Sequence, residues 1–165
     1  MPLAIILTHA HFDHIGAVDA VRDEYNIPVY VHEKEADWLV DPNLNGSGRY
    51  EMLPNISGRR ADYLINKEQT LNVGDFSLQI LETPGHSPGS ISLFIEDAGI
   101  VVAGDALFNG SIGRTDLPGG NSAQLLTSIH EKLLILPEET IVLCGHGPVT
   151  TIRQEMDSNP FLHGF

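Results

Sequence analysis

The chain has little of what several common classes of protein require. It contains a single cysteine, Cys144, so no disulfide can form within it, which is typical of a reducing compartment such as the cytoplasm. It contains 9 lysine and arginine residues and 22 aspartate and glutamate residues, which gives a net charge of −13 at pH 7. Nucleic-acid binding and attachment to an anionic membrane surface both need a basic face, so this balance argues against both.

Long apolar runs are also missing. The longest, LAIIL and IVVAG, are far shorter than the roughly 20 residues that span a bilayer. No basic segment with a long apolar core opens the chain, so we expect no secretory signal in it. These features predict a cytoplasmic protein that acts on a small molecule and contacts neither nucleic acid nor membrane.

The pattern of apolar residues predicts an α/β fold in one domain over residues 1–165. Helical spacing occurs in GAVDAVRDEY, in KEADWLV and in SAQLLTSIHEKLLIL, where Leu125, Ile129 and Leu133 recur at every fourth position. Residues 42–60 are rich in Gly, Asn, Pro and Ser, which predicts a long surface loop or lid. The expected strands, which point to a sheet of mixed directions, are LAIIL, PVYVH, QTLNV, FSLQILET, SISLFIE, GIVVAG and TIVLCG.

The stretch LTHAHFDHIGA is the strongest functional signal. His9, His11, Asp13 and His14 lie within six positions, directly after the apolar run LAIIL. Alternate residues of an extended segment point the same way, so His9 and His11 can reach one ion. Asp13 and His14, at the turn into the next helix, can reach another. Such a group of polar side chains at a strand end predicts a metal site.

Three further candidate ligands follow later strands. His86 lies in ETPGHSPGS, Asp105 in VVAGDALF and His146 in VLCGHGP, each after a strand and a glycine. Together with the first cluster they make five imidazoles and two carboxylates, a donor set that suits Zn²⁺, Fe or Mn²⁺. Seven ligands are too many for one tetrahedral ion but suit two ions with one shared carboxylate.

Other polar residues have simpler interpretations. Arg114 and Asp116 in GRTDLPGG can pair with each other, and Cys144, on an apolar strand, is expected to act as a small buried hydrophobe. Asp105 taken alone can be a turn former. Hydrogen-bonded structural roles are expected for His32, His130 and His163.

The motifs THAHFDHIGA, TPGHSPGS, AGDALF and CGHGP resemble the successive motifs of the metallo-β-lactamase fold superfamily. Within that superfamily, SIGRTDLPGG is similar to the small glyoxalase II-like (hydroxyacylglutathione hydrolase-like) hydrolases of bacteria. The fold that this resemblance implies is an αββα sandwich of two mixed β-sheets flanked by helices. It also implies His9, His11 and His86 as ligands of one ion, Asp13, His14 and His146 as ligands of the other, and Asp105 as the bridge.

The activity implied is thioester hydrolysis with two divalent metal ions, most simply zinc, with iron or manganese as alternatives. A hydroxide that bridges the ions, oriented by Asp13, would attack the carbonyl of an S-acyl thiol carrier. Asp13 and Asp105 are therefore the expected catalytic residues, and Arg114 is expected to bind a carboxylate of the carrier.

Two other activities stay open at this point. Persulfide dioxygenases resemble the same scaffold and use a single iron, which His9, His86 and Asp105 would hold as a two-histidine, one-carboxylate face. The chain can also be a metal-binding but inactive fragment. β-Lactam hydrolysis is disfavoured, because no secretory signal opens the chain.

The superfamily usually has several strands before its first motif, whereas here the motif begins at His9. The resemblance therefore implies an N-terminally truncated fold. In that case the strand Leu3–Leu7 would leave an apolar flank and unpaired backbone groups, which favours strand-mediated association. We expect a homo-oligomer through this strand, or partial disorder there.

Overall fold

The computed structural model describes residues 1–163, and the chain divides into two compact units. The first unit is Met1–Asn66 and the second begins at Lys67. Each has a hydrophobic core of its own. No helix within residues 1–163 is both long and apolar enough to cross a membrane.

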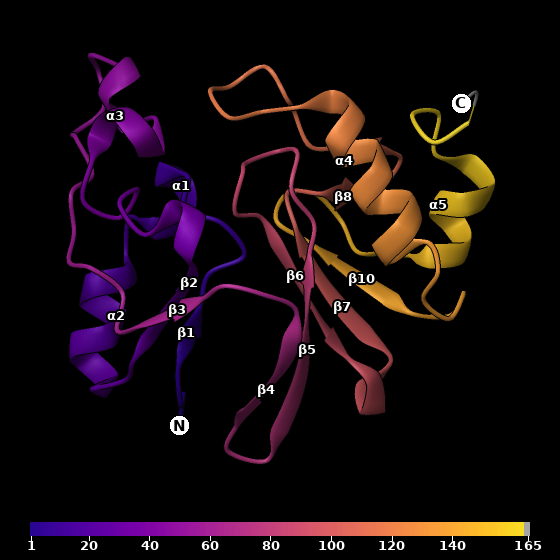
Figure 1. The fold of residues 1–165 in the computed structure, drawn as a ribbon, viewed down its shortest axis with the longest axis horizontal. Coiled ribbons are helices and arrows are strands. Elements are labelled where there is room, and N and C mark those ends of the chain that lie inside the picture. The colour runs from indigo at the N-terminus through magenta and orange to yellow at the C-terminus, as the bar shows by residue number, and fades with distance from the viewer. Residues whose placement is uncertain (164–165) are drawn as a thin grey trace. The chain divides into compact units, whose positions relative to one another are not determined.

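The first unit is built around three parallel strands in the order β1-β2-β3 (Figure 1). The strands are β1 (Ile5–Ile6), β2 (Val29–His32) and β3 (Tyr63–Ile65). The helices are α1 (Phe12–Ile15), α2 (Val18–Tyr25) and α3 (Pro42–Asn45), with 3-10 turns η1 (Glu33–Glu35) and η2 (Ser47–Arg49). Helix α2 ends at Asn26, whose left-handed backbone (φ 50°) stops the helix.

The strand expected over LAIIL is shorter than the apolar run. Only Ile5–Ile6 form β1, which pairs with β2 and stands at the edge of the three-stranded sheet. Leu3 is exposed, Ile5 and Ile6 are partly buried and Leu7 is buried, so the burial of the apolar run increases towards its end. Leu7 and its neighbours in the core hold the strand end from which the first histidines follow.

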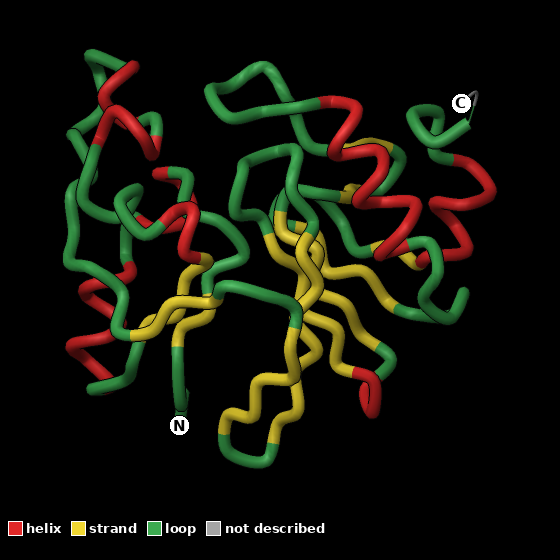
Figure 2. Tube along the Cα trace, in the orientation of Figure 1, coloured by secondary structure: helices red, strands yellow, loops and turns green. Residues whose placement is uncertain are grey.

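Two segments of the first unit differ from their sequence-based expectation. The helix expected over KEADWLV is a single 3-10 turn, η1, followed by further turns. Glu35 of this turn is fully buried and accepts the backbone N–H of Ala10. The loop expected over residues 42–60 contains α3 and η2 (Figure 2). Asp41 begins α3 by accepting the N–H of Asn43, a side-chain cap at the helix N-terminus.

The second unit contains a mixed six-stranded sheet in the order β11-β10-β7-β6-β5-β4. Only β10 and β7 are parallel neighbours, and the other pairs are antiparallel. Its strands are β4 (Gln69–Val73), β5 (Phe76–Glu82), β6 (Ile91–Ile95), β7 (Ile100–Gly104), β10 (Ile141–Cys144) and β11 (Thr150–Thr151). A 3-10 turn, η3 (Glu96–Ala98), joins β6 to β7, and a small hairpin, β8 (Leu107–Phe108) and β9 (Ser111–Ile112), follows β7.

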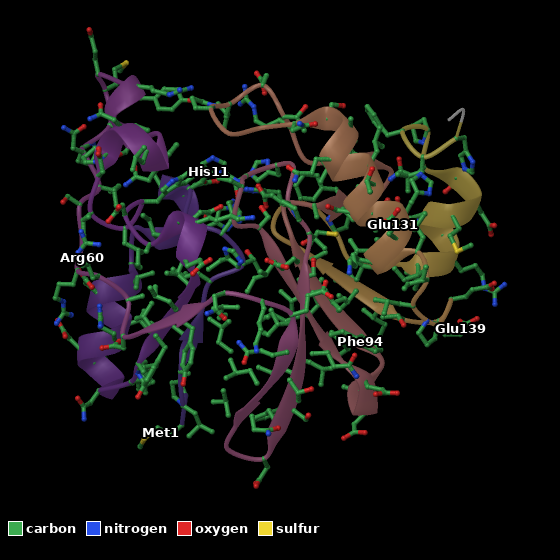
Figure 3. The ribbon with its side chains drawn as sticks, in the orientation of Figure 1. Met1, His11, Arg60, Phe94, Glu131 and Glu139 are labelled. Atoms are coloured by element: carbon green, nitrogen blue, oxygen red, sulfur yellow. The ribbon has the colours of Figure 1, made fainter. Side chains whose placement is uncertain are left out.

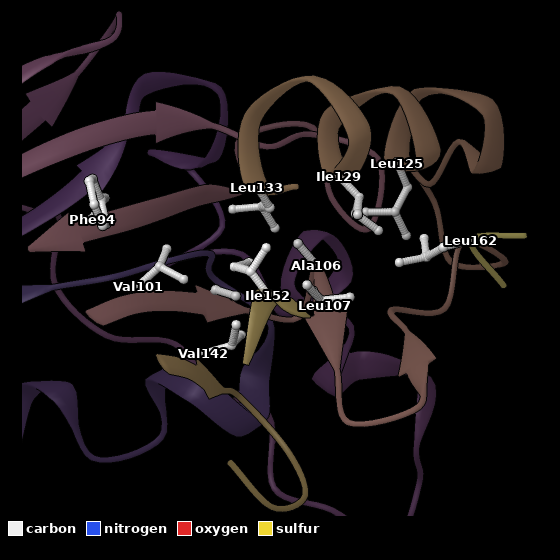
Figure 4. Packing of buried hydrophobic residues seen from close by; sticks show 11 residues of the cluster. Phe94, Val101, Ala106, Leu107, Leu125, Ile129, Leu133, Val142, Ile152 and Leu162 are labelled. Atoms are coloured by element: carbon white, nitrogen blue, oxygen red, sulfur yellow. The ribbon is translucent and has the colours of Figure 1, made fainter. Parts of the chain in front are cut away.

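Helices α4 (Ser122–Ser128) and α5 (Ile152–Ser158) cover this sheet, and α4 continues as a π-helical turn, Ile129–Leu133. Leu125, Ile129 and Leu133 are fully buried, which confirms the predicted apolar face. They pack in one cluster with Val101 and Val142 of the sheet (Figure 4). This packing fixes the strand ends that carry the later candidate ligands.

A buried carboxylate ties α5 to the β8–β9 hairpin. The side chain of Glu155 is fully buried and accepts hydrogen bonds from the N–H of Gly110 (2.9 Å), the hydroxyl of Thr150 (2.5 Å) and the amide of Asn159 (2.7 Å). The amide of Asn159 also donates to the carbonyl of Ser111 (3.0 Å). The hairpin turn is therefore held by α5.

We predict that Glu155→Ala lowers the free energy of unfolding by about 3 kcal/mol, because several buried donors lose their acceptor together. Urea unfolding followed by circular dichroism measures this. The matched control is Glu139→Ala, which removes an exposed carboxylate (Figure 3). That carboxylate pairs with Arg153 at the surface, so its loss should leave the unfolding midpoint unchanged. Equal unfolding midpoints for the two variants would show that the buried hydrogen bonds of Glu155 do not stabilise the hairpin.

Candidate metal centre

The first ligand group, His9, His11, Asp13 and His14, lies on the segment that follows β1. His11 is extended (φ −65°, ψ 151°) and precedes α1, so Asp13 and His14 fall in a single helical turn. The ring centroids of His9 and His11 are 5.0 Å apart, and those of His9 and His14 are 4.1 Å apart. Nε2 of His14 lies 3.5 Å from Oδ2 of Asp13. The structure therefore brings these four side chains together.

Neighbouring side chains fix this segment. The buried carboxylate of Glu35 accepts the N–H of Ala10, between the first two histidines, at 2.6 Å. The ring of Trp38 lies 5.3 Å from that of His11. Sequence reasoning missed Glu35, because an acidic residue in a predicted helix is usually exposed.

The second ligand group, His86, Asp105 and His146, lies in the second unit. Nε2 of His86 is 3.5 Å and Nε2 of His146 is 3.4 Å from the same carboxylate oxygen, Oδ2 of Asp105. His86 and Asp105 are buried, whereas the side chain of His146 is about half exposed. One carboxylate with an imidazole at either side is the arrangement expected of a ligand shared between two ions.

A backbone carbonyl orients His86. Nδ1 of His86 donates to the carbonyl oxygen of Arg114 at 2.8 Å. A proton held on Nδ1 by this bond leaves the lone pair on Nε2, the ring nitrogen that faces Asp105. This contact carries no signal in the sequence, since any residue at position 114 offers the same carbonyl.

Glycines allow the close packing around Asp105. A Cβ at Gly113 would collide with the backbone carbonyl of Asp105, and a Cβ at Gly145 would collide with its side-chain Oδ1. Gly145 also donates its N–H to the carbonyl of Gly104 at 2.7 Å, which joins the ends of β10 and β7. Position 145, directly before His146, therefore has no room for a side chain, which explains the glycine there.

Arg114 and Asp116 form the ion pair that the sequence suggested as one possibility. Nε and Nη2 of Arg114 donate to the two carboxylate oxygens of Asp116, each at 2.7 Å. These hydrogen bonds lower the pKa of the Asp116 carboxyl to about 2, so the pair stays ionised at neutral pH. That Arg114 binds a carrier stays a prediction.

The remaining candidates lie in different surroundings, and a structural hydrogen bond is seen for His32. His32 is buried, and its Nδ1 accepts the N–H of Lys34 at 3.3 Å, as expected of a structural histidine. His130 and His163 are exposed. Cys144 is half-buried; burial raises the pKa of its thiol, and the nearby carboxylates of Glu155 and Asp105 add to this, which favours the neutral thiol.

The donor chemistry of the two groups fits transition-metal ions. Imidazole nitrogens and carboxylate oxygens suit zinc, iron and manganese, and no thiolate of a structural zinc site takes part. Each compact unit supplies one of the two groups. That the groups share a pair of ions stays a prediction.

The family model of the metallo-beta-lactamase superfamily matches residues 1–146. The chain therefore belongs to the metallo-β-lactamase superfamily, and it has that superfamily's fold. A probable metallo-hydrolase of Bacillus subtilis, YqgX, is 59% identical over 164 residues, which cover 99% of this chain and 77% of that protein. The hydroxyacylglutathione hydrolase GloC of Haemophilus influenzae is 38% identical over 160 residues, covering 96% of this chain and 75% of that protein.

Solved structures agree with this assignment. The BLEG-1 B3 metallo-beta-lactamase superposes with a TM-score of 0.96 at 59% identity, covering 99% of this chain and 78% of that one. TTHA1623 in a di-iron-bound form gives a TM-score of 0.81 at 39% identity, covering 98% and 78%. These similarities establish a metallo-hydrolase family for the chain.

We predict that Gly145→Ala weakens metal binding by about 10- to 100-fold although it removes no ligand, because the added methyl group displaces the Asp105 carboxylate. Zinc competition with a chromophoric chelator measures the affinity. Gly16→Ala is the control, since its Cβ meets only the carbonyl oxygen of Phe12 at 3.6 Å. Unchanged affinity in Gly145→Ala would show that Asp105 is not held where the structure places it.

Proposed function

We propose that the chain hydrolyses thioesters, with the two ligand groups meeting around two divalent ions. The observation that supports this most is the position of Asp105, whose Oδ2 faces His86 and His146 at similar distances. The name of the Haemophilus relative, a hydroxyacylglutathione hydrolase, gives the same reaction class. Two ions held by these residues would supply a nucleophilic hydroxide near neutral pH and would polarise the substrate carbonyl.

The residues of the chain have separate roles in this proposal. Asp105 is the shared ligand, and the carbonyl of Arg114 keeps His86 in the tautomer that presents Nε2. Asp13 is about 40% exposed and lies beside His14, so its carboxylate can orient the attacking water and hold its proton. The guanidinium of Arg114, already aligned by Asp116, is the proposed contact for a carboxylate of the thiol carrier.

The leaving group favours a thioester over an amide. Thiols have a pKa near 8.5, so a thiolate departs without a proton donor. An amine must be protonated as it departs, which needs a positioned acid. The ligand groups alone therefore meet the needs of thioester hydrolysis.

β-Lactam hydrolysis is the second candidate, because the 59% identical BLEG-1 structure is described as a B3 metallo-beta-lactamase. In that reaction the ring nitrogen would be the leaving group, and the proton that Asp13 takes from the attacking water would have to reach this nitrogen as it departs. A substrate panel separates the two activities.

Protein loaded in turn with zinc, iron or manganese is analysed for bound metal and assayed with a hydroxyacylglutathione, a β-lactam and a glutathione persulfide in the presence of O₂. We expect two ions per chain and thiol release from the thioester. β-Lactam opening without thiol release would favour the second candidate. One iron per chain with O₂ consumption would instead favour persulfide oxidation and overturn the proposal.

We predict that Asp105→Ala reduces the content of both ions and abolishes turnover together, because both depend on one carboxylate. Elemental analysis beside the rate assay tests this. The control is Asp97→Ala, which removes an exposed carboxylate in the turn between β6 and β7. Full metal content with a near-normal rate in Asp105→Ala would show that this residue is not a metal ligand and serves only to form the turn.

A further inference from the structure

The short turn after β2 contacts the segment that carries His9 and His11. In this turn the N–H of Trp38 donates to the carbonyl of Glu35 at 3.0 Å, a bond between residues three apart. Residues at this spacing lie on one side of a 3-10 turn, so Glu35 and Trp38 share a face. Both side chains are buried. The amide of Asn45 holds the carbonyl of Trp38 at 2.9 Å, which fixes the turn from its other end.

The contact of Glu35 falls between two candidate ligands. Ala10 separates His9 from His11, and all three residues are buried. The pairing of β1 with β2 ends before this point, and here the carboxylate of Glu35 accepts the N–H of Ala10 at 2.6 Å. A backbone N–H that is removed from water needs an acceptor, and a carboxylate makes a short, strong hydrogen bond with it. The position of this peptide is therefore set by a side chain.

The peptide of Ala10 governs the directions of both neighbouring side chains. On an extended segment His9 and His11 point the same way, and a rotation of the peptide between them would move them relative to each other. The ring of Trp38 lies 5.3 Å from that of His11, on the same face of the turn as Glu35. Groups that hold metal ligands from behind change metal affinity by about 10- to 100-fold when they are removed.

We propose that Glu35 is a positioning residue of the first ligand group. By holding the Ala10 peptide it fixes the geometry of His9 and His11, and so raises the affinity of the group for a divalent ion. Glu35 acts through the backbone and through its hydrogen bond, not through its charge. This inference rests on the metal binding of the proposed function and holds whichever reaction the bound ions serve.

Two variants separate the hydrogen bond from the charge. Glu35→Gln removes the charge but keeps a carbonyl oxygen at the same reach, which can accept the N–H of Ala10. Glu35→Asp keeps the charge but is one methylene shorter, which withdraws the carboxylate from Ala10. Glu33→Ala is the matched control, since it removes an exposed carboxylate from the same turn.

Trp38 supplies the readout. It is the single tryptophan of the chain, and its ring lies close to that of His11, so a paramagnetic ion at the first ligand group quenches its fluorescence. Metal-free protein is titrated with cobalt(II), a divalent ion that nitrogen and oxygen ligands bind. We expect Glu35→Asp to weaken cobalt binding by about 10- to 100-fold. Glu35→Gln and Glu33→Ala should bind cobalt as the unmodified protein does.

A purely structural role gives a different result. The urea midpoint of metal-free Glu35→Asp would then fall while the cobalt affinity of the folded variant stayed unchanged, and this would overturn the inference. Weakening in Glu35→Gln with none in Glu35→Asp would assign the effect to the charge and would also overturn it. If Glu35→Asp does not fold, hydrogen exchange of the unmodified protein decides, because the Ala10 N–H should exchange slowly. Rapid exchange there would refute the positioning role.

The same titration separates this inference from the proposed reaction. Cobalt binding that depends on residue 35 in this way, in a protein that cleaves no thioester, would refute thioester hydrolysis and support the inference. Thioester cleavage with equal cobalt affinity in all variants would do the reverse. An unmodified protein that binds no cobalt would overturn both.

Discussion

The carboxylate of Asp105 is the constraint on which the second unit depends. Its Oδ2 faces the imidazoles of His86 and His146, and its surroundings exclude any side chain at Gly113 and Gly145. Burying a charged carboxylate costs free energy unless a cation or hydrogen-bond donors compensate its charge. The glycines and strand ends around Asp105 therefore hold its carboxylate in one position, between the imidazoles of His86 and His146 and the backbone.

The two ligand groups are built by different means. In the first unit a parallel strand ends, an extended segment carries two histidines, and one helical turn carries Asp13 and His14. In the second unit, three loops after separate strands each supply one ligand, and a hydrogen bond to the carbonyl of Arg114 orients His86. Each ligand group is therefore positioned by the core of its own unit.

Much of this organisation was predictable from the sequence. Apolar periodicity located the main strands and the buried face of α4, because burial selects the same residues that set the pattern. The strands β3, β8, β9 and β11 were missed, since two or three residues are too few to show a period. The type and position of the histidines and aspartates predicted which side chains come together within each unit, and their role as metal ligands stays a prediction. Glu35, Glu155 and the carbonyl of Arg114 were not, because their roles arise from tertiary packing.

We propose that ligands from both compact units hold a pair of ions, with Asp105 shared between them. Anomalous diffraction from crystals of the metal-loaded protein tests it most directly. The account predicts two peaks about 3.5–4 Å apart, with Asp105 in contact with both and ligands from residues on either side of Lys67. A single peak bound by only one ligand group, or two ions with Asp105 bound to neither, would contradict it.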